Sequence, residues 1–305
     1  MIDLLELKKI GVQFGDKQVL KDISIKFQPG EIIGLVAPNG TGKSTLMNVI
    51  MNYLPPNQGK VILNHELQYS SKANEVKIHQ DVSMMPDQSD LYNHVSGKNH
   101  LKIYQEMWNS DPKLIDDTIV KLGMESYVKK KTGTYSLGMR QRLCFAMQIV
   151  SNTQVMLMDE VMNGLDPTHV ELISQILLQK KAEGKTIIIA SHLLENLEQY
   201  ADRIFFMKNG ELKLVDDVSP GFSDNKVTTV RVSNFSQELL IVFKEQFPEL
   251  AVQTLPNGKT LIDVKEQDTI TLGAITQYLI AQRLTDFSFG KLTLNDLYSL
   301  EYQQS

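Results

Sequence analysis

The stretch "VAPNGTGKSTLM", which runs from Val36 to Met47, constrains the fold of this chain more than any other. It follows the continuously apolar run "IIGLVA" at residues 32–37, which is typical of a strand covered on both faces, and it leads into a helix-compatible run. Gly40 and Gly42 allow positive φ angles and a close approach of the backbone to a ligand. Backbone N–H groups at such a turn, together with the positive end of the following helix, can surround a phosphate. We therefore predict a phosphate-binding loop between a buried strand and a helix.

Only the second half of this loop follows the G-x-x-x-x-G-K-[ST] pattern strictly. Ala37 occupies the first glycine position, where the strand enters the loop, and a methyl group is tolerated there provided that the local φ is negative. Lys43 is placed to reach the β- and γ-phosphates of a nucleotide, and Ser44 to offer its hydroxyl to Mg²⁺. The alternative is a glycine-rich turn that caps a helix, with Lys43 simply solvated.

Two further apolar runs predict an α/β core. "VMLM" at residues 155–158 and "IIIA" at 187–190 flank an amphipathic stretch at 168–184 that has a basic last turn and ends in glycine. Strand, helix and strand in this order predict a parallel βαβ unit. Alternation at residues 19–27 predicts a half-buried strand in an edge or covering sheet. Residues 95–150 are mostly helix-like, so we expect a helical insertion between sheet strands.

The sequence pattern changes after Gly210. Residues 226–290 read as a strand, a helix, a hairpin that turns at Asn257-Gly258, a second helix and a strand. This βαββαβ order predicts a small ferredoxin-like α+β domain. The expected domains are an α/β domain at 1–218 with a helical subdomain at about 92–150, and an accessory domain at 219–305.

Composition restricts the classes of partner. The 305 residues have a formal net charge of −5 and lack an overall basic character, so we expect no nucleic acid partner. The start of the chain lacks the layout of a signal peptide, and no run approaches the roughly 18 apolar residues of a membrane-spanning helix. Work at a membrane would therefore need another chain. Cys144 is the only cysteine, and we expect it to be a packing residue.

Acidic and histidine side chains follow the other buried runs. Asp159 and Glu160 come directly after residues 155–158, and His192 follows residues 187–190. Ligands of open α/β sheets collect at the carboxyl ends of the strands. Asp159 is therefore placed to support Mg²⁺, Glu160 to polarise an attacking water, and His192 to contact the γ-phosphate. Taken singly, a solvated acidic pair and a structural histidine explain these residues as well.

A second turn could bind an anion. Ser136 and Gly138, in "TYSLGMRQRL", open a predicted helix, and a helix N-terminus of this kind can bind a phosphate. An ordinary capped helix is the alternative for this turn.

The order of these motifs resembles the ATP-binding cassette (ABC) family over residues 2–215. "APNGTGKST" is similar to the Walker A loop, "SLGM" to the signature motif, "VMLMDE" to Walker B, "NGLD" to the D-loop and "SHLLE" to the H-loop, and Phe14 resembles the aromatic residue of the A-loop. The resemblance implies a P-loop NTPase cassette with a mixed-sheet core, an antiparallel subdomain and a helical subdomain. It also implies an ATPase that binds ATP and Mg²⁺.

The resemblance implies a role for each matching residue. The catalytic residues would be Lys43, Glu160 and His192, and the metal-site residues Ser44, Asp87 and Asp159. Two cassettes would sandwich two ATP molecules head to tail as a homodimer or heterodimer. The residues in contact with nucleotide would be Phe14, Asn39, Gly40, Thr41, Gly42, Lys43, Ser44 and Thr45 of one cassette and Ser136 and Gly138 of the other.

The sequence departs from the family pattern at several positions. Leu137 and Met139 replace a glycine and a glutamine of the signature motif, so the contacts from that turn are expected to be fewer. In "MMPDQSDLY", which resembles the Q-loop, Asp87 occupies the usual glutamine position and Gln88 follows it. We assign the metal-sensing role to Asp87, with Gln88 as the alternative. Val161 replaces a common proline, which we expect to be tolerated.

The resemblance is greatest to cassettes of bacterial exporters of antimicrobial peptides, lipids or drugs. It implies a separate transmembrane permease, docked on the Q-loop and the helical region near residues 91–108, and hence a cytoplasmic location on the inner face of the cell membrane. An importer cassette with a regulatory C-terminal domain is one alternative. A soluble ATPase of translation or DNA metabolism is another, although the chain has a single GKST and no long heptad coiled coil. For the C-terminal domain we favour a dimer-stabilising role over ligand sensing, because no convergent polar cluster is evident.

Overall fold

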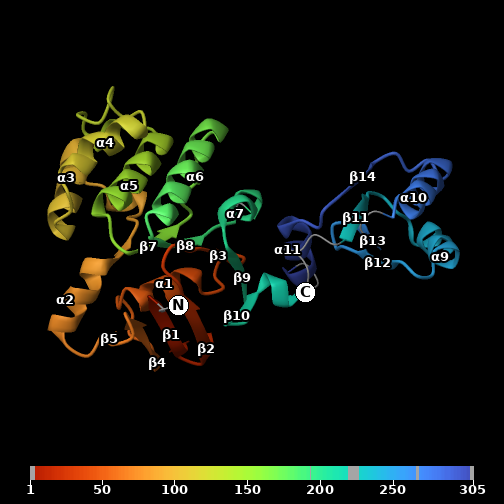
Figure 1. Ribbon diagram of the computed structural model, residues 1–305, viewed down its shortest axis with the longest axis horizontal. Coiled ribbons are helices and arrows are strands. Elements are labelled where there is room, and N and C mark those ends of the chain that lie inside the picture. The colour runs from red at the N-terminus through yellow and green to blue at the C-terminus, as the bar shows by residue number, and fades with distance from the viewer. Residues whose placement is uncertain (1–3, 193, 219–226, 266–267, 303–305) are drawn as a thin grey trace. The chain divides into compact units, whose positions relative to one another are not determined.

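The computed structural model describes residues 4–192, 194–218, 227–265 and 268–302 (Figure 1). The chain divides into two compact units, Met1–Leu214 and Val215–Ser305. The domain boundary predicted between residues 218 and 219 falls at the edge of the segment 219–226, which lies outside the described residues.

A six-stranded sheet forms the centre of the first unit, in the order β10-β9-β3-β8-β7-β6. Strands β6, β7, β8, β3 and β9 are parallel, and β10 pairs antiparallel with β9. The three apolar runs form β3, β7 and β8, which confirms them as strands, and every residue of β3 and β8 is buried. The strands span Ile32–Val36 (β3), Val82–Met84 (β6), Val155–Asp159 (β7), Thr186–Ala190 (β8), Arg203–Lys208 (β9) and Glu211–Leu214 (β10).

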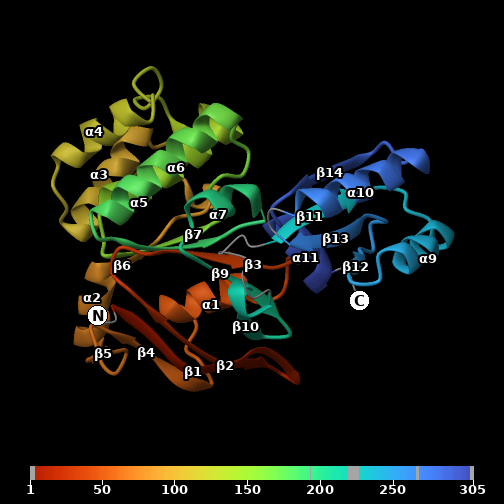
Figure 2. The same cartoon turned by 45° about the vertical axis from the view of Figure 1, so that its right-hand side comes forward.

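A second, antiparallel sheet has the order β2-β1-β4-β5. It contains the predicted half-buried strand, whose alternation is visible in the burial of β2. In both views the first helix, α1, lies between this sheet and the central one (Figures 1 and 2). The strands span Leu5–Phe14 (β1), Lys17–Phe27 (β2), Gln58–Leu63 (β4) and Leu67–Gln68 (β5).

The helices α3, α4 and α5 are inserted in the chain between β6 and β7 and gather on one side of this unit (Figure 2). The predicted helical insertion is therefore confirmed. Helix α5 is buried along most of its length because it packs among the other helices of this group and against the sheet. The helices of this unit are α1 (Lys43–Ile50), α2 (Lys72–Asp81), α3 (Gly97–Trp108), α4 (Lys113–Lys121), α5 (Leu137–Ser151), α6 (Pro167–Ala182) and α7 (Leu194–Tyr200), with 3-10 turns η1 (Gln88–Asp90) and η2 (Thr132–Thr134).

The second unit contains a four-stranded antiparallel sheet of order β12-β13-β11-β14. Its core is aromatic, with the ring of Phe243 4.7 Å from that of Phe247 and 5.3 Å from that of Tyr278, centroid to centroid. The elements are α8 (Val215–Val218), β11 (Val227–Val232), α9 (Gln237–Gln246), β12 (Ala251–Thr254), β13 (Thr260–Lys265), α10 (Thr269–Ala281), β14 (Phe287–Gly290) and α11 (Leu294–Tyr302).

Within the described ranges, none of the helices combines the length and the apolar character that crossing a membrane requires.

Candidate active site

The loop between β3 and α1 has the backbone geometry that its sequence predicts. Gly40 and Gly42 have φ angles of 78° and 115°. A Cβ on Gly42 would lie 3.1 Å from the side chain of Leu20, so both the angle and the space require glycine there. Ala37 is buried and is not among the residues with positive φ, which explains why a methyl group is accepted at this position. Among the residues that the structure describes, no side chain caps the start of α1, whose first N–H groups can therefore face a ligand.

Lys43 is not solvated. Its side chain is buried, and Nζ donates hydrogen bonds to the carbonyl oxygens of Ala37 at 2.7 Å and Pro38 at 3.2 Å. Burial lowers the pKa of Lys43, and the carboxylates of Glu160 and Asp159 act in the opposite direction. A buried ammonium group that donates to two backbone carbonyls is well placed to bind an anion such as phosphate.

The glycine loop borders a cavity of about 300 Å³. The cavity lies where β3 and β7 end, as expected for a ligand site in an α/β sheet. The hydroxyl of Thr41 donates to the carbonyl of Pro38 at 2.8 Å, a hydrogen bond that stabilises the loop itself. The cavity is lined by Val19, Asn39, Gly40, Gly42, Lys43, Ser44, Thr45, Asp159 and Glu160.

Two oxygen ligands suitable for Mg²⁺ meet in this cavity. The hydroxyl of Ser44 donates to Oδ2 of Asp159 at 2.9 Å. Burial raises the pKa of Asp159, and the hydrogen bond from Ser44 opposes that rise. Among the described residues, no group of three His, Cys, Asp or Glu side chains could hold a metal by itself. One hydroxyl and one carboxylate suit Mg²⁺, which prefers oxygen ligands, takes few of them from protein and completes its shell with phosphate oxygens and water.

Glu160 and His192 come together at the ends of two neighbouring strands. His192 Nδ1 lies 2.8 Å from Oε2 of Glu160. Glu160 follows β7 with a φ of 51°, and its N–H donates to the carbonyl of Ala190, the last residue of β8, at 2.9 Å. A positive φ is uncommon for a non-glycine residue and is found more often at functional sites.

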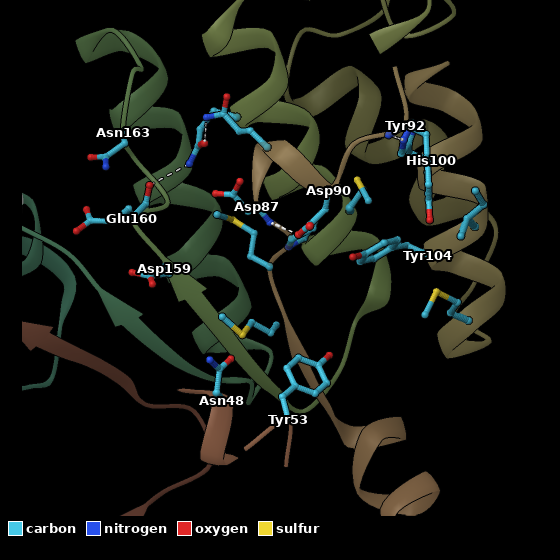
Figure 3. A pocket seen from close by; sticks show the side chains of 18 residues that line it. Asn48, Tyr53, Asp87, Asp90, Tyr92, His100, Tyr104, Asp159, Glu160 and Asn163 are labelled. Carbon is cyan, nitrogen blue, oxygen red and sulfur yellow. Dashed lines mark hydrogen bonds between the residues drawn. The ribbon is translucent and has the colours of Figure 1, made fainter. Parts of the chain in front are cut away.

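A larger cavity of about 670 Å³ adjoins the same carboxylates (Figure 3). Asp159, Glu160 and Asn163 form one side of it, and the segment from β6 to α3 forms the other. Its ionisable lining residues are acidic, apart from His100 and the tyrosines. The lining residues are Asn48, Tyr53, Met84, Met85, Pro86, Asp87, Gln88, Asp90, Tyr92, His100, Ile103, Tyr104, Met107, Gln141, Met147, Asp159, Glu160 and Asn163.

Asp87 and Gln88 both line this larger cavity but make different contacts. Asp87 caps η1, where its carboxylate accepts a hydrogen bond from the N–H of Ser89 at 2.8 Å. Hydrogen bonds from Ser89 lower the pKa of Asp87, so its carboxylate is held in the charged form. The side chain of Gln88 instead donates to Oε1 of Gln141 at 2.5 Å.

Besides Thr41, three predicted nucleotide contacts line neither cavity. Phe14 ends β1 with an exposed side chain and lines neither cavity. Ser136 caps α5 by accepting from the N–H of Met139 at 3.3 Å. A Cβ on Gly138 would come within 3.3 Å of the carbonyl of Gly164. Leu137 between them is 62% exposed, so the signature turn presents an apolar side chain to the outside.

The sequence patterns missed one residue of this site, Gln141. It is buried on α5, and its Nε2 donates to the carbonyls of Glu160 at 3.0 Å and Val161 at 2.9 Å. The available signal was an amide on the same helix face as the apolar residues Cys144 and Phe145, because a buried amide needs hydrogen-bond partners.

Comparison with known proteins agrees with this geometry. The family described as "ABC transporter" matches residues 20–163. The uncharacterized ABC transporter ATP-binding protein YdbJ of Bacillus subtilis is 34% identical over 216 residues, which cover 69% of this chain and 68% of the relative. The lantibiotic transport ATP-binding protein SrtF of Streptococcus pyogenes is 29% identical over 211 residues, which cover 69% of this chain and 90% of SrtF.

A solved structure supports the fold. The ATP-binding subunit of an ABC transporter superposes with a TM-score of 0.66 at 22% sequence identity, over 72% of this chain and 93% of that one. The identity to YdbJ over more than two thirds of each chain, together with the phosphate loop and the carboxylates at its sheet edge, establishes the family. The chain belongs to the ABC transporter family, in which it is an ATP-binding cassette that hydrolyses ATP.

Proposed function

We propose that this cassette is the nucleotide-binding subunit of a bacterial exporter of peptide, lipid or drug, and that it drives a separate membrane subunit. The observation that carries the proposal is the meeting of the two cavities at Asp159 and Glu160. One cavity suits a triphosphate and the other suits a side chain of a partner protein. Asp159 and Glu160 border both cavities, so they lie between the proposed nucleotide site and the proposed docking site. The likeness to a protein whose name describes lantibiotic transport supports export.

The proposed division of labour follows the contacts. Lys43 and the glycine-loop N–H groups hold the phosphates, with Asn39 and Thr41 in the same loop and Thr45 in the first turn of α1. Ser44 and Asp159 hold Mg²⁺, and Asp87 responds to it from the neighbouring cavity. When bound, Mg²⁺ neutralises charge that develops on the phosphate oxygens. Glu160 orients and polarises the attacking water, and His192, whose Nδ1 lies 2.8 Å from Oε2 of Glu160, contacts the γ-phosphate.

A second cassette completes the proposed site. Ser136 and Gly138 line neither cavity of their own chain, so their proposed contact is with the ATP of a partner cassette. Phe14 is exposed at the end of its strand, where it is available to stack on adenine. Each ATP would then touch Lys43, Ser44 and Asp159 of one chain and the signature turn of the other.

The larger cavity is the proposed docking site of the membrane subunit, at the inner face of the cell membrane. Met107, Tyr92 and Tyr53 are each more than half exposed beside it, which is unusual for large apolar side chains. Asp87 and Asp90 add negative charge to the same wall. The expected occupant is a short helix that carries a bulky apolar side chain and a lysine or arginine.

A pull-down from solubilised membranes tests this function. Tagged protein with the Glu160→Gln substitution, held in Mg-ATP, should recover a stoichiometric polytopic membrane protein that mass spectrometry identifies. Met107→Glu added to that protein should reduce the recovery several-fold, whereas Val76→Glu, at an exposed position on α2 outside the cavity, should not. Recovery of ribosomes or DNA-bound factors would contradict transport, and an importer permease would contradict export.

For the domains, we propose an ABC ATPase domain at 1–218 and an accessory domain at 219–305, with the helical subdomain at about 92–150. We also propose that the accessory domain is ferredoxin-like. In support, its sheet order puts β11 between β13 and β14, and its elements alternate as strand, helix, strand, strand, helix and strand.

The proposed role of the accessory domain is to stabilise the cassette dimer. Size-exclusion chromatography of the full chain and of a chain that ends at residue 218, both with Glu160→Gln and ATP, tests that role.

A further inference from the structure

Gln141 connects the two cavities through its side-chain amide. Its Nε2 faces two carbonyl oxygens, those of Glu160 and Val161, at 3.0 and 2.9 Å. Since carbonyls only accept hydrogen bonds, the NH₂ end of the amide must point at them, and Oε1 must point the other way. There Oε1 accepts from Nε2 of Gln88 at 2.5 Å. The buried amide therefore uses both of its N–H bonds and its oxygen.

The residue that Gln141 holds has an unusual backbone. Glu160 has a φ of 51°, a conformation that persists in a non-glycine residue only when its surroundings enforce it. Its N–H is bound to the carbonyl of Ala190 at 2.9 Å, and its carbonyl also accepts from the N–H of Asn163 at 3.1 Å. Those two contacts come from the neighbouring strand and from the turn itself. Gln141 contributes the contact from the helical insertion, through its hydrogen bond to the carbonyl of Glu160.

The other end of this chain of hydrogen bonds is on the wall of the larger cavity. Gln88 lines that cavity in η1, between β6 and α3. Its carbonyl oxygen accepts from Nη1 of Arg140 at 3.2 Å, so both its backbone and its side chain are tied to α5. η1 is therefore joined to α5 at two neighbouring residues, Arg140 and Gln141.

We propose that Gln141 is a positioning residue for Glu160, and that Gln88 holds the Gln141 amide in the orientation that this role requires. The proposal rests on the proposed role of Glu160 in activating water. Gln141 acts on the backbone that aims the Glu160 carboxylate, and not on the nucleotide. It should therefore affect the chemical step far more than the binding of ATP.

Steady-state ATPase kinetics of the purified full chain test the proposal. Gln141→Met keeps the length of the side chain but removes its donors, and we expect kcat to fall about tenfold or more, because small misplacements of a reacting group have large effects on rate. KM for ATP should stay within about twofold, because uniform binding is untouched. Gln88→Met should lower kcat less, because the Gln141 donors remain in place.

The double variant tests whether the two residues act in series. If Gln88 acts only through Gln141, Gln88→Met should add nothing to Gln141→Met. Gln148→Met is the matched control. Gln148 is buried two turns further along the same face of α5 and donates to Oγ of Ser83 at 2.9 Å, away from Glu160. Its variant should resemble Gln141→Met in thermal stability but keep the kcat of the unmodified chain.

Several outcomes would overturn the proposal: equal losses in Gln141→Met and Gln148→Met, a rise in KM in place of a fall in kcat, or additive effects of the two glutamines. Glu160→Gln in the same assay separates the proposal from its premise. If Glu160→Gln retains turnover, the proposed role of Glu160 fails. If Glu160→Gln is inactive while Gln141→Met is unaffected, only the positioning role fails.

Discussion

Two clusters in this chain each contain a basic side chain and an aspartate, but the hydrogen bonds of the two aspartates differ. In the cassette, Lys43 donates to backbone carbonyls and Asp159 accepts from one hydroxyl, and both border a cavity. In the C-terminal unit, Asp296 accepts on one oxygen from Nε and Nη2 of Arg231 at 2.9 and 2.6 Å. The N–H and the hydroxyl of Thr293 donate to that same oxygen at 2.9 and 2.7 Å.

The difference is visible in the two aspartates. Burial raises the pKa of Asp159, and its hydrogen bond does not offset the rise. Burial acts in the same direction on Asp296, but the hydrogen bonds from Arg231 and Thr293 outweigh it and lower the pKa of this carboxyl. The Asp296 carboxylate accepts several hydrogen bonds within the fold and joins α11 to the sheet. The Asp159 carboxylate accepts one and borders a cavity, which is typical of a group that binds a ligand.

The largest effect is expected at Glu160. Glu160→Gln should lower ATP turnover about a thousandfold, because general base catalysis is lost while the shape of the side chain is kept. ATP binding should persist, and ATP-bound dimer should accumulate on size-exclusion chromatography. Glu171→Gln, at an exposed position on α6, is the control. Undiminished turnover in the Glu160 variant would remove it from the catalytic role.

Lys43→Ala should weaken ATP binding about a hundredfold, since a buried cation facing phosphate makes strong charge-assisted bonds. Isothermal titration calorimetry measures the affinity. Lys185 is the matched control, because it is also buried, its pKa is also lowered by burial, and it donates to the carbonyl of Asn152 at 2.8 Å outside both cavities. Equal losses of affinity in Lys43→Ala and Lys185→Ala would mean that the phosphate loop has no special role.

Asp296→Ala tests the other side of the comparison. It leaves the Arg231 side chain, which is only 16% exposed, without its carboxylate and should lower the stability of the C-terminal unit by about 3 kcal/mol. Urea unfolding followed by far-UV circular dichroism measures this loss. Trp108, the only tryptophan, reports on the cassette by its fluorescence, and its transition should stay in place. A loss of ATP affinity in Asp296→Ala would show that this cluster is not merely structural.

The smallest effect concerns pH. Because the folded-state pKa of Asp296 is lowered, its stabilising contribution is present above the ordinary value of 3.8 and is lost as the pH falls through the lower, folded value. The urea midpoint of the C-terminal unit should therefore drop more steeply below about pH 4 in the unmodified chain than in Asp296→Asn. Parallel pH profiles of the two proteins would contradict the assignment.

The site was predictable where it depended on local pattern. Apolar runs identified β3, β7 and β8, and the rule that ligands collect where parallel strands end placed Asp159, Glu160 and His192 near the phosphate loop. The sequence contained no such signal for the strand order β2-β1-β4-β5 or for the shape of the larger cavity, because both depend on which surfaces pack together.

By itself, the sequence determined the phosphate loop, because its glycines, Lys43 and Ser44 act within a few residues of one another. Only the tertiary structure decided which way Asp87 and Gln88 turn, and that Gln141 reaches Glu160. These side-chain orientations depend on hydrogen bonds between residues far apart in the chain, such as the one that joins Gln88 and Gln141 across 53 positions. A buried amide must find a partner, but its sequence neighbours do not specify which partner that is.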